Sequence, residues 1–438
     1  MSEGTIDLAR GLREELRHRI RPMTGRDPDD RDRRTTPLEL LYDLTYVIAF
    51  GAAAEQLADH LGDGHVAGAI GAYVFAVFSI TWAWTSFTWF SSAYGNDDAL
   101  FRVATLVQMV GVVVLTFGLP ASFEAAAEGE NPNAVLMVVG YVVMRVPQLA
   151  LWLRAAAQDP EHRRTALGYA VVVAVAQVGW VLTAVVHVPV AVTVVALVVL
   201  ALAELTAPVV LERRLGPVPW NAGHIAERFS LLTLITIGEV VAATTSAVGA
   251  LVGEKGWSAP AVVIVSAGLV LAAALWWAYF LVPSQLLLQR WPERTFAWRS
   301  VHLPLFGALA AVGAGLRVAT VAVERAELSL LDVALALAVP VAAFVVIVYL
   351  LWSVLTRSWD LTHVPLFGLC VLPLVAAVVV GVTADTDGRF DLEQPGDLTA
   401  LLAVTALVAL SAVVEVVGHE RVGYPHTLQA VAEADVRG

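Results

Sequence analysis

Twelve apolar segments of bilayer-spanning length are the feature of this sequence that most limits its fold. A transmembrane helix needs about 20 residues to cross a hydrocarbon layer about 30 Å thick, and only 15% of the 438 residues are charged, against about 25% in soluble domains. Backbone groups in lipid must be satisfied within the chain, as they are in helices. The sequence therefore predicts an all-α polytopic membrane protein, with helices at about 38–58, 66–90, 103–123, 133–153, 165–186, 188–211, 224–250, 259–283, 300–322, 332–356, 364–384 and 398–418.

The basic residues alternate in step with these segments. Of 27 lysines and arginines, 21 fall before the first segment, in every second loop or after the last segment, whereas three fall in the opposite loops and three inside the segments. Basic residues accumulate in short cytoplasmic loops, so this pattern predicts that both termini face the cytoplasm. The first 37 residues hold nine arginines and no apolar core, and we therefore expect no cleavable signal peptide there.

Residues 1–37 form a basic arm ahead of the first segment. Leucines and an isoleucine recur at every fourth position of residues 5–20, with arginines around them. A basic amphipathic segment of this kind either lies on anionic lipid headgroups or remains solvated. Residues 24–34 are expected to be a charged linker. The expected partner is thus the bilayer, with anionic lipids under the arm and no nucleic acid.

The first and seventh segments resemble each other. A shift of 188 positions places Glu39 on Glu227 and the pair 44–45 on the pair 232–233. Six helices in each half would leave both halves in the same orientation, as in parallel repeats about an axis along the membrane normal. The sequence therefore favours two six-helix halves, 38–212 and 224–418, followed by a cytoplasmic tail at 419–438.

Four short motifs are spread over most of the chain. They are Thr-Pro-Leu-Glu-Leu-Leu-Tyr-Asp-Leu at 36–44, Glu-Arg-Phe at 227–229 with Ile-Gly-Glu at 237–239, Trp-Trp-Ala-Tyr-Phe at 276–280, and His-Leu-Pro-Leu at 302–305. In this order they resemble the motifs of the bacterial low temperature requirement protein A family. The resemblance implies a multi-pass protein of the bacterial plasma membrane that is linked to growth in the cold. It implies no catalytic residues.

Two carboxylates open the first segment. Thr36, Pro37 and Glu39 have the spacing of a capping box with proline at the first helical position, which gives Glu39 a structural role. Asp43 lies one turn further along the same face. It is either wetted at the interface or part of a buried site. An ionisable side chain near the middle of the bilayer costs about 2.5–3.5 kcal/mol, so a buried Asp43 would need a partner.

Charges deeper in the segments are the stronger candidates for a functional site. Glu239 follows Gly238 near the middle of the seventh segment, and we expect it in a polar interior cluster with Asp43 or an arginine rather than alone. Arg145 precedes Pro147, which is expected to disturb its helix, and a charge beside a helix break is typical of transporter sites. The other candidates for an ion or solute pathway are Glu204 and Arg317 as pairing partners, His302, Glu227 and Glu39.

Three functions remain open at this point. Buried carboxylates and prolines within segments, namely Pro147, Pro208, Pro340 and Pro373, favour a secondary transporter or an ion or proton pathway. A membrane-embedded lipid-handling enzyme would need clustered nucleophiles and bases, and the sequence offers only His302. A structural or regulatory membrane component would use the charges to hold helices together. The sequence contains no phosphate loop, nucleophile elbow, zinc motif or cysteine pair, so no catalytic residue, metal or cofactor is expected.

Overall fold

The computed structural model describes residues 20–132, 134–325, 328–359, 363–384, 390 and 394–437. Within these ranges the chain is helical and contains twelve spans long and apolar enough to cross a membrane, which confirms the all-α membrane fold. The helices are α2 Pro37–Gly62, α3 Val66–Tyr94, α4 Ala99–Phe117, α5 Leu119–Ala127, α6 Val135–Gln158, α7 Arg163–Val185, α8 Val190–Leu215, α9 Ala222–Lys255, α10 Ala259–Phe280, α11 Ser284–Arg290, the 3-10 turn Pro292–Arg294, α12 Thr295–Arg325, α13 Leu330–Thr356, α14 His363–Ala384, α15 Pro395–Gly418, the π-helical turn His419–Gly423 and α16 Tyr424–Arg437.

Local sequence explains where these helices begin and where one of them breaks. Thr36 caps α2 in the expected capping box, and Asp98 caps α4 by accepting a hydrogen bond from the amide of Phe101. The third predicted segment is divided at Gly118 into α4 and α5. The prediction that Pro147 disturbs its helix is not met by a break, because α6 runs continuously from Val135 to Gln158.

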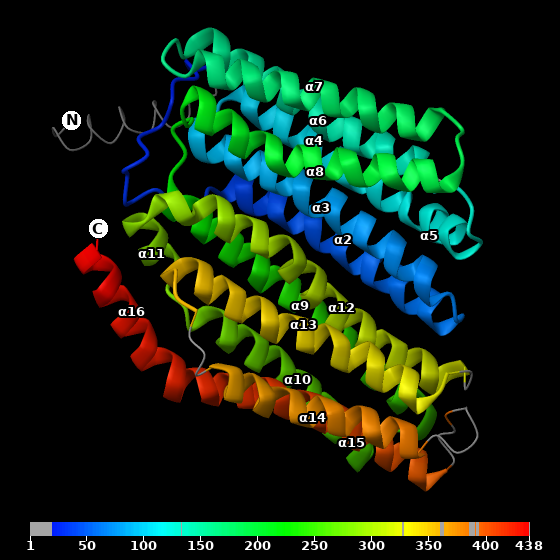
Figure 1. Cartoon of the computed structure of the whole chain (residues 1–438). Coiled ribbons are helices and arrows are strands. Elements are labelled where there is room, and N and C mark those ends of the chain that lie inside the picture. The colour runs from blue at the N-terminus through cyan, green and yellow to red at the C-terminus, as the bar shows by residue number, and fades with distance from the viewer. Residues whose placement is uncertain are drawn as a thin grey trace, which may run out of the picture.

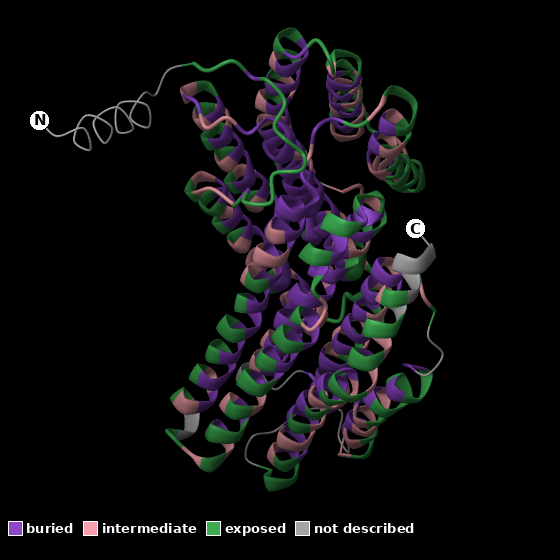
Figure 2. Cartoon of the chain, turned by 90° about the vertical axis from the view of Figure 1, so that its left-hand side faces the viewer, coloured by how far each residue is buried: buried purple, intermediate pink, exposed green. Residues whose placement is uncertain are grey.

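Helices α2, α3, α9 and α12 form the centre of the bundle. In the most apolar stretch of each span, 72% of α12 is buried, against 17% of α8, so α12 is central and α8 is peripheral. Helix α12 contacts α2, α3, α9 and α13, and α2 also contacts α9. Figure 1 shows α2 and α3 lying beside α9 and α12 between the outer helices of the two halves. Buried residues follow these inner contacts, and exposed residues cover the outward faces (Figure 2).

The two halves use similar helix contacts. In the first half, α2 contacts α3 and α4, α4 contacts α6, α6 contacts α7, and α7 contacts α8. In the second half, α9 contacts α10 and α12, α12 contacts α13, α13 contacts α14, and α14 contacts α15. The sixth helices differ, since α15 also packs along α10. A duplicated fold stays a prediction that superposition of the halves would test.

Residues 20–36 lie across one end of the bundle, which we call the arm end. The amide of Arg26 donates to the carbonyl of Ala93 at 2.9 Å, and the side chain of Asn221 donates to the carbonyls of Pro28 and Asp30 at 2.8 Å each. Residues 24–34 have no helix or strand, as expected of a charged linker. Hydrogen bonds to and from their backbone hold them on the bundle. The amphipathic residues 5–19 lie outside the described residues.

A second contact holds the start of the arm. Asp98 accepts hydrogen bonds from Arg154 and from the amide of Arg21. Burial raises the pKa of Asp98, but the hydrogen bonds from Arg154 and from the amides of Phe101 and Arg21 outweigh it and lower the pKa to about 2. The carboxylate is therefore charged at neutral pH and keeps its donors.

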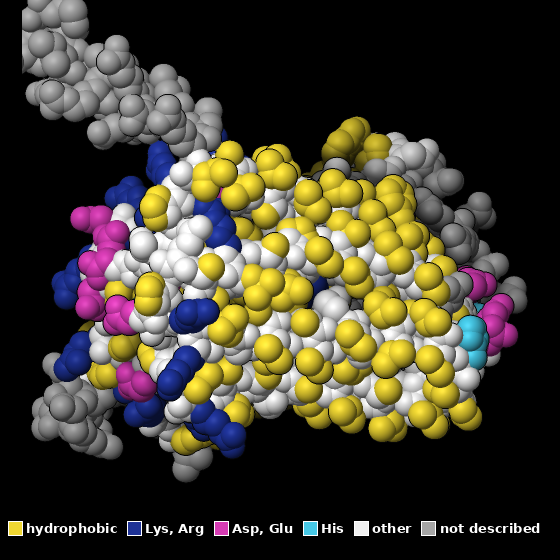
Figure 3. All heavy atoms as spheres, turned by 90° about the horizontal axis from the view of Figure 1, so that it is seen from above, with side chains coloured by type: hydrophobic (Ala, Val, Ile, Leu, Met, Phe, Trp, Pro, Cys, Tyr) yellow, Lys and Arg dark blue, Asp and Glu magenta, His cyan; other side chains and the backbone are white. Residues whose placement is uncertain are grey.

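The outer surface has the pattern of a membrane protein. Apolar side chains form a broad band, and most charged side chains lie at its two ends (Figure 3). The arm and helix α16 lie at the same end of the bundle (Figure 1), as an even number of spans requires.

Small residues allow α12 to approach its neighbours closely. A Cβ atom placed on Gly315 would lie 2.3 Å from the carbonyl oxygen of Ala336 in α13. Such a contact leaves no room for a side chain, and backbone cannot move aside as a flexible side chain can. The absence of a side chain at Gly315 thus permits the close packing of α12 on α13.

We predict that Gly315→Val destabilises the protein strongly, because its side chain must separate α12 from α13. Overpacking in a core costs about 1–3 kcal/mol and more where backbone must shift. The matched control is Gly249→Val in α9, where an added Cβ meets nothing within 4 Å. Thermal unfolding of both variants in detergent measures the difference. Equal unfolding temperatures would contradict the close α12–α13 contact.

Candidate functional site

Most of the charged residues that the sequence singled out fall into three buried clusters at different places in the bundle. The first joins α2 to α9, and we call it the α2–α9 cluster: Glu39, Asp43, His224 and Arg228. The second is a pair of Glu239 in α9 with Arg317 in α12. The third is a pair of Arg145 in α6 with Glu204 in α8. These clusters contain six of the eight residues that the sequence singled out.

Arg228 is the centre of the α2–α9 cluster. Its Nη2 atom lies 2.5 Å from Oδ1 of Asp43, and its Nε atom lies 3.2 Å from Oδ2, so the guanidinium binds both carboxylate oxygens. Its Nη1 atom lies 3.2 Å from Oε1 of Glu39. The side chains of all three residues are buried. Bidentate geometry of this kind is the strongest form of ion pair, and it answers the question the sequence left open for Asp43.

Glu39 has two roles at once. Its Oε2 atom accepts hydrogen bonds from the amide and the hydroxyl of Thr36, which completes the capping box. Its Oε1 atom faces Arg228 and lies 3.4 Å from Nε2 of His224. Glu39 is therefore both the cap of α2 and a member of the buried cluster.

Aromatic and polar groups of α3 enclose this cluster. The indole of Trp84 donates to Oδ1 of Asp43 at 2.6 Å, and its ring lies 5.5 Å from the guanidinium carbon of Arg228. The Ser91 hydroxyl accepts from Nη1 of Arg228 at 3.3 Å, while the Ser91 carbonyl accepts from Arg33 of the arm at 2.9 Å. The arm thus covers the cluster from the arm end. Ser91 lies between Arg33 of the arm and Arg228 and is hydrogen-bonded to both.

The α2–α9 cluster contains more acid than base. Two carboxylates face one guanidinium, and the remaining ionisable group is the imidazole of His224, whose Nδ1 atom has no hydrogen-bond partner. With a neutral imidazole the four residues carry a formal charge of −1. An uncompensated charge in a desolvated site is expensive. The buried guanidinium of Arg33, which donates to the Ser91 carbonyl, partly offsets the excess of acid.

Glu239 lies deeper in the bundle, on the same seam between α2 and α9. Nη2 and Nε of Arg317 lie 2.6 Å and 3.1 Å from Oε1 of Glu239. An added Cβ on Gly51 of α2 would lie 2.9 Å from Oε2, so the carboxylate is in contact with α2. The expectation that Glu239 pairs with an arginine in the interior is confirmed. Its partner is Arg317, while Asp43 binds Arg228.

Arg145 and Glu204 form the polar centre of the first half. Nη2 of Arg145 lies 2.8 Å from Oε1 of Glu204, and both side chains are at most 2% exposed. The other oxygen of Glu204 accepts from the hydroxyl of Tyr141 and the indole of Trp180 at 2.9 Å each. Both oxygens of Glu204 are therefore occupied, and the expectation that Glu204 takes part in a buried charge pair is confirmed.

The two remaining candidates lie elsewhere. Glu227 is half-buried and accepts a hydrogen bond from the amide of Thr35 at 3.2 Å, so it holds the arm. His302 is buried, with Nε2 2.9 Å from the hydroxyl of Tyr279 and Nδ1 2.9 Å from the carbonyl of Trp298. Both ring nitrogens of His302 thus have a hydrogen-bond partner. The tight hydrogen bonds favour a packing role for His302.

Sequence reasoning missed four residues. His224 and Arg228 have the same four-residue spacing on α9 as Glu39 and Asp43 have on α2, and this match was a usable signal. Glu212 was assigned to a polar break, but it is buried and accepts hydrogen bonds from Trp89, Tyr169 and Trp220. Arg299 was counted as a loop charge, but it is 4% exposed.

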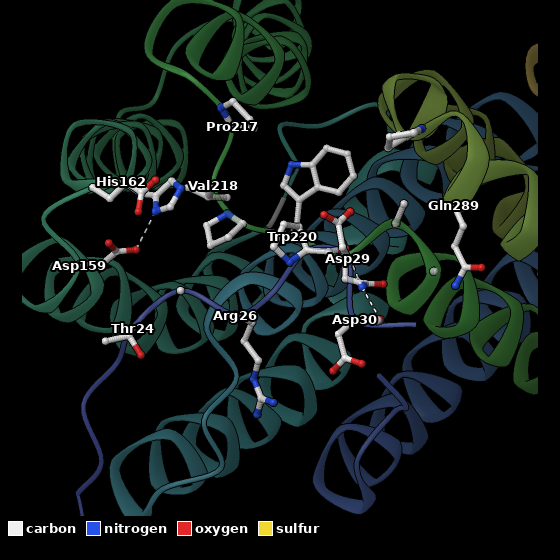
Figure 4. A pocket seen from close by; sticks show the side chains of 18 of the residues that line it. Thr24, Arg26, Asp29, Asp30, Asp159, His162, Pro217, Val218, Trp220 and Gln289 are labelled. Atoms are coloured by element: carbon white, nitrogen blue, oxygen red, sulfur yellow. Dashed lines mark hydrogen bonds and ion pairs between the residues drawn. The ribbon is translucent and has the colours of Figure 1, made fainter. Parts of the chain in front are cut away.

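A wide cavity lies between the arm and the ends of the helices. It has a volume of about 1030 Å³ and is lined by residues of the arm, of the α6–α7 connection and of the first turn of α9. Figure 4 shows the Asp159–His162 pair on one side, Gln289 on the other, and Trp220 between them. The lining includes Asn221 and Gly223, directly before His224. The lining thus reaches the residue before His224, while the four residues of the α2–α9 cluster are not part of it.

Comparison with known proteins places this arrangement in a family. The model of the bacterial low temperature requirement A protein family matches residues 34–417. The chain belongs to this family. An uncharacterized protein of Rhizobium meliloti (strain 1021) is 26% identical over 213 residues, which cover 46% of this chain and 48% of that protein. The match thus spans about half the length of that relative. No solved structure matches the chain.

The family match includes all three clusters, since it extends from before Glu39 to beyond Arg317. Within the part of the chain that the structure describes, no group of three or more His, Cys, Asp or Glu side chains could hold a metal ion.

We predict that Arg228→Gln destabilises the protein by about 3–5 kcal/mol, because it leaves buried carboxylates without their counter-charge. Adding Asp43→Asn should recover part of the loss. Arg102→Gln is the control, since Arg102 and Asp97 form an exposed pair that contributes at most about 1 kcal/mol. Unfolding temperature and yield in detergent measure all three. A stable Arg228→Gln single variant would mean that the pair does not hold α2 to α9.

Proposed function

We propose that this protein is a secondary transporter or proton pathway of the bacterial plasma membrane, and that the α2–α9 cluster is its proton-binding site. The observation that supports the proposal is the excess of acid in that cluster. Two carboxylates share one guanidinium beside an imidazole in a fully buried site. Such a site changes its charge when it gains or loses one proton, and a change of charge is what couples protons to conformation in a carrier.

The geometry of the seam supports the same proposal. On α2, Glu239 contacts Gly51. Gly51 is eight residues from Asp43, or roughly 12 Å along a helix. On α9, Arg228 and Glu239 are eleven residues apart, or roughly 16 Å. Two ionisable sites therefore follow each other along one interhelical contact from the arm end toward the middle of the bundle.

Cytoplasmic access is part of the proposal. The loops at the arm end carry most of the basic residues, and the positive-inside pattern assigns that end to the cytoplasm. The cavity beneath the arm would then open to the cytoplasm, and its lining extends to Gly223, the residue before His224. The arm, bonded to the bundle through Arg33, Thr35 and Asn221, covers the route when it is docked as described.

A pH jump on reconstituted protein tests the proton site without knowledge of the solute. We expect wild-type proteoliposomes on a solid-supported membrane to show a transient charge displacement when the pH changes through neutrality. In Glu39→Gln one carboxylate faces one guanidinium, so the cluster has no excess carboxylate that would bind a proton. The displacement signal should therefore fall to that of protein-free vesicles. His224→Gln should reduce it as well.

Glu55→Gln is the matched control, because Glu55 is an exposed carboxylate on the same helix. It should keep the wild-type signal. A full displacement signal in both Glu39→Gln and His224→Gln, with monodisperse protein, would refute the cluster as the proton site. If neither the wild type nor any variant gives a displacement signal, the proposed proton pathway is refuted.

Membrane orientation gives a separate prediction. In a Cys370→Ser background, a cysteine at position 290 should react with an impermeant maleimide only after the membrane is opened, because this loop lies at the arm end. Serine is chosen because Cys370 donates to Glu415 at 3.0 Å and a hydroxyl keeps that hydrogen bond. If the cysteine at position 290 is labelled from outside intact cells, the predicted orientation is wrong.

A lipid-handling role is the second candidate, favoured by a groove of about 1010 Å³ between the halves. Helices α3, α8, α12 and α13 contribute most of its apolar lining, with Glu130 and Asp332 among the few charged residues. A groove of this composition fits acyl chains. A stoichiometric lipid bound to purified protein, together with an absence of proton-dependent currents, would favour this role over transport.

A further inference from the structure

We infer that the first half contains a binding site for a small monovalent anion, next to the Arg145–Glu204 pair. The site is a cavity of about 20 Å³ among α3, α6, α7, α8 and the start of α12. It is separate from the α2–α9 cluster, and the inference does not depend on the proposed transport function.

The decisive observation is the kind of polar atom left without a partner. Four residues that line the cavity carry N–H groups with no acceptor: Nε and Nη2 of Arg299, Nε of Arg145, Nε2 of Gln148 and Nε1 of Trp82. All four residues are at least 95% buried. Buried donors without acceptors are costly, and here every unmet group is a donor.

Arg299 adds positive charge to these donors. No ion pair is found for it among the described residues, and its guanidinium carbon lies 5.3 Å, 4.8 Å and 4.9 Å from the ring centres of Trp82, Trp89 and Phe296. Aromatic faces stabilise a cation only in part. The carboxylate of Glu212 interacts with the charge of Arg299 over a longer distance but forms no hydrogen bond or ion pair with it. The buried N–H groups of Arg299 therefore remain able to bind an anion.

The acceptors near the cavity are already in use. Glu204 binds Arg145 through one oxygen and Tyr141 and Trp180 through the other. The Oε1 atom of Gln148 accepts from Arg145 at 2.7 Å. Glu212 is not part of the lining, and its oxygens bind Trp89, Tyr169 and Trp220. None of these carboxylates is left to satisfy Arg299.

Size and hydrogen-bond character then define the ligand. A cavity of about 20 Å³ holds about one water-sized particle, which excludes carboxylate- or phosphate-bearing solutes. A water molecule would bring two donors into a site that already has an excess of donors. A halide only accepts hydrogen bonds. The geometry therefore points to chloride or an anion of similar size.

Halide titration of the purified full-length protein tests the site. At constant ionic strength, chloride and bromide should raise the unfolding temperature of the wild type in a saturable way, because a ligand that binds only the folded state stabilises it. Gluconate, which is too large for the cavity, should not. Bromide should also appear by anomalous scattering between Arg299 and Gln148 in crystals grown with the salt.

Gln148→Glu is the sharpest variant. It keeps the oxygen that binds Arg145 but replaces the free donor with negative charge, so halide affinity should fall by about tenfold or more while the protein stays folded. Arg299→Met should lose the halide effect as well. Arg290→Gln, an exposed arginine on α11, is the control and should keep it.

Two results would overturn the inference. One is a folded wild type whose stability does not distinguish chloride from gluconate. The other is a halide effect of equal affinity in Gln148→Glu, Arg299→Met and the wild type, which would place the anion elsewhere. Neither result affects the pH-jump signal of the α2–α9 cluster. The proposed anion site and the proposed proton site can therefore be refuted independently.

Discussion

The cost of removing charge from water governs this structure. Asp43, Glu39 and Arg228 are buried within one contact between α2 and α9, and each would be unfavourable there alone. Their mutual pairing, the indole of Trp84 and the capping hydrogen bonds from Thr36 make the site tolerable. Because these groups come from three helices, the pairing also fixes how α2, α3 and α9 meet.

The interior is electrostatically asymmetric. The α2–α9 cluster holds more acid than base, while the cavity beside Arg145 holds donors and a guanidinium that no acceptor meets. The Glu239–Arg317 pair is balanced. Sites that are already balanced can be explained by helix packing alone, whereas the two unbalanced ones each require a further particle. We propose that a proton balances the first site and a small anion the second, and the functional interpretation therefore depends on these two sites.

Part of the candidate site could be read from the sequence. Glu239 and Arg145 lie far from their helix ends, so they needed partners, and Arg317 and Glu204 were the available charges of opposite sign. Glu212 and Arg299 could not be recognised in the same way. Each lies beside other charged or polar residues near a helix end, and local hydropathy does not reveal that the tryptophans at positions 82, 89 and 220 fold over them.

The sequence by itself determined that this is a membrane protein with twelve spanning helices. In lipid each segment satisfies its own backbone hydrogen bonds, so the fold class depends on local composition and length. Only the tertiary structure decided which charges meet, that residues 20–36 dock on the bundle, and that α6 continues through Pro147. These outcomes depend on the lateral packing of helices far apart in the chain, such as α2 against α9, and no local pattern encodes such contacts.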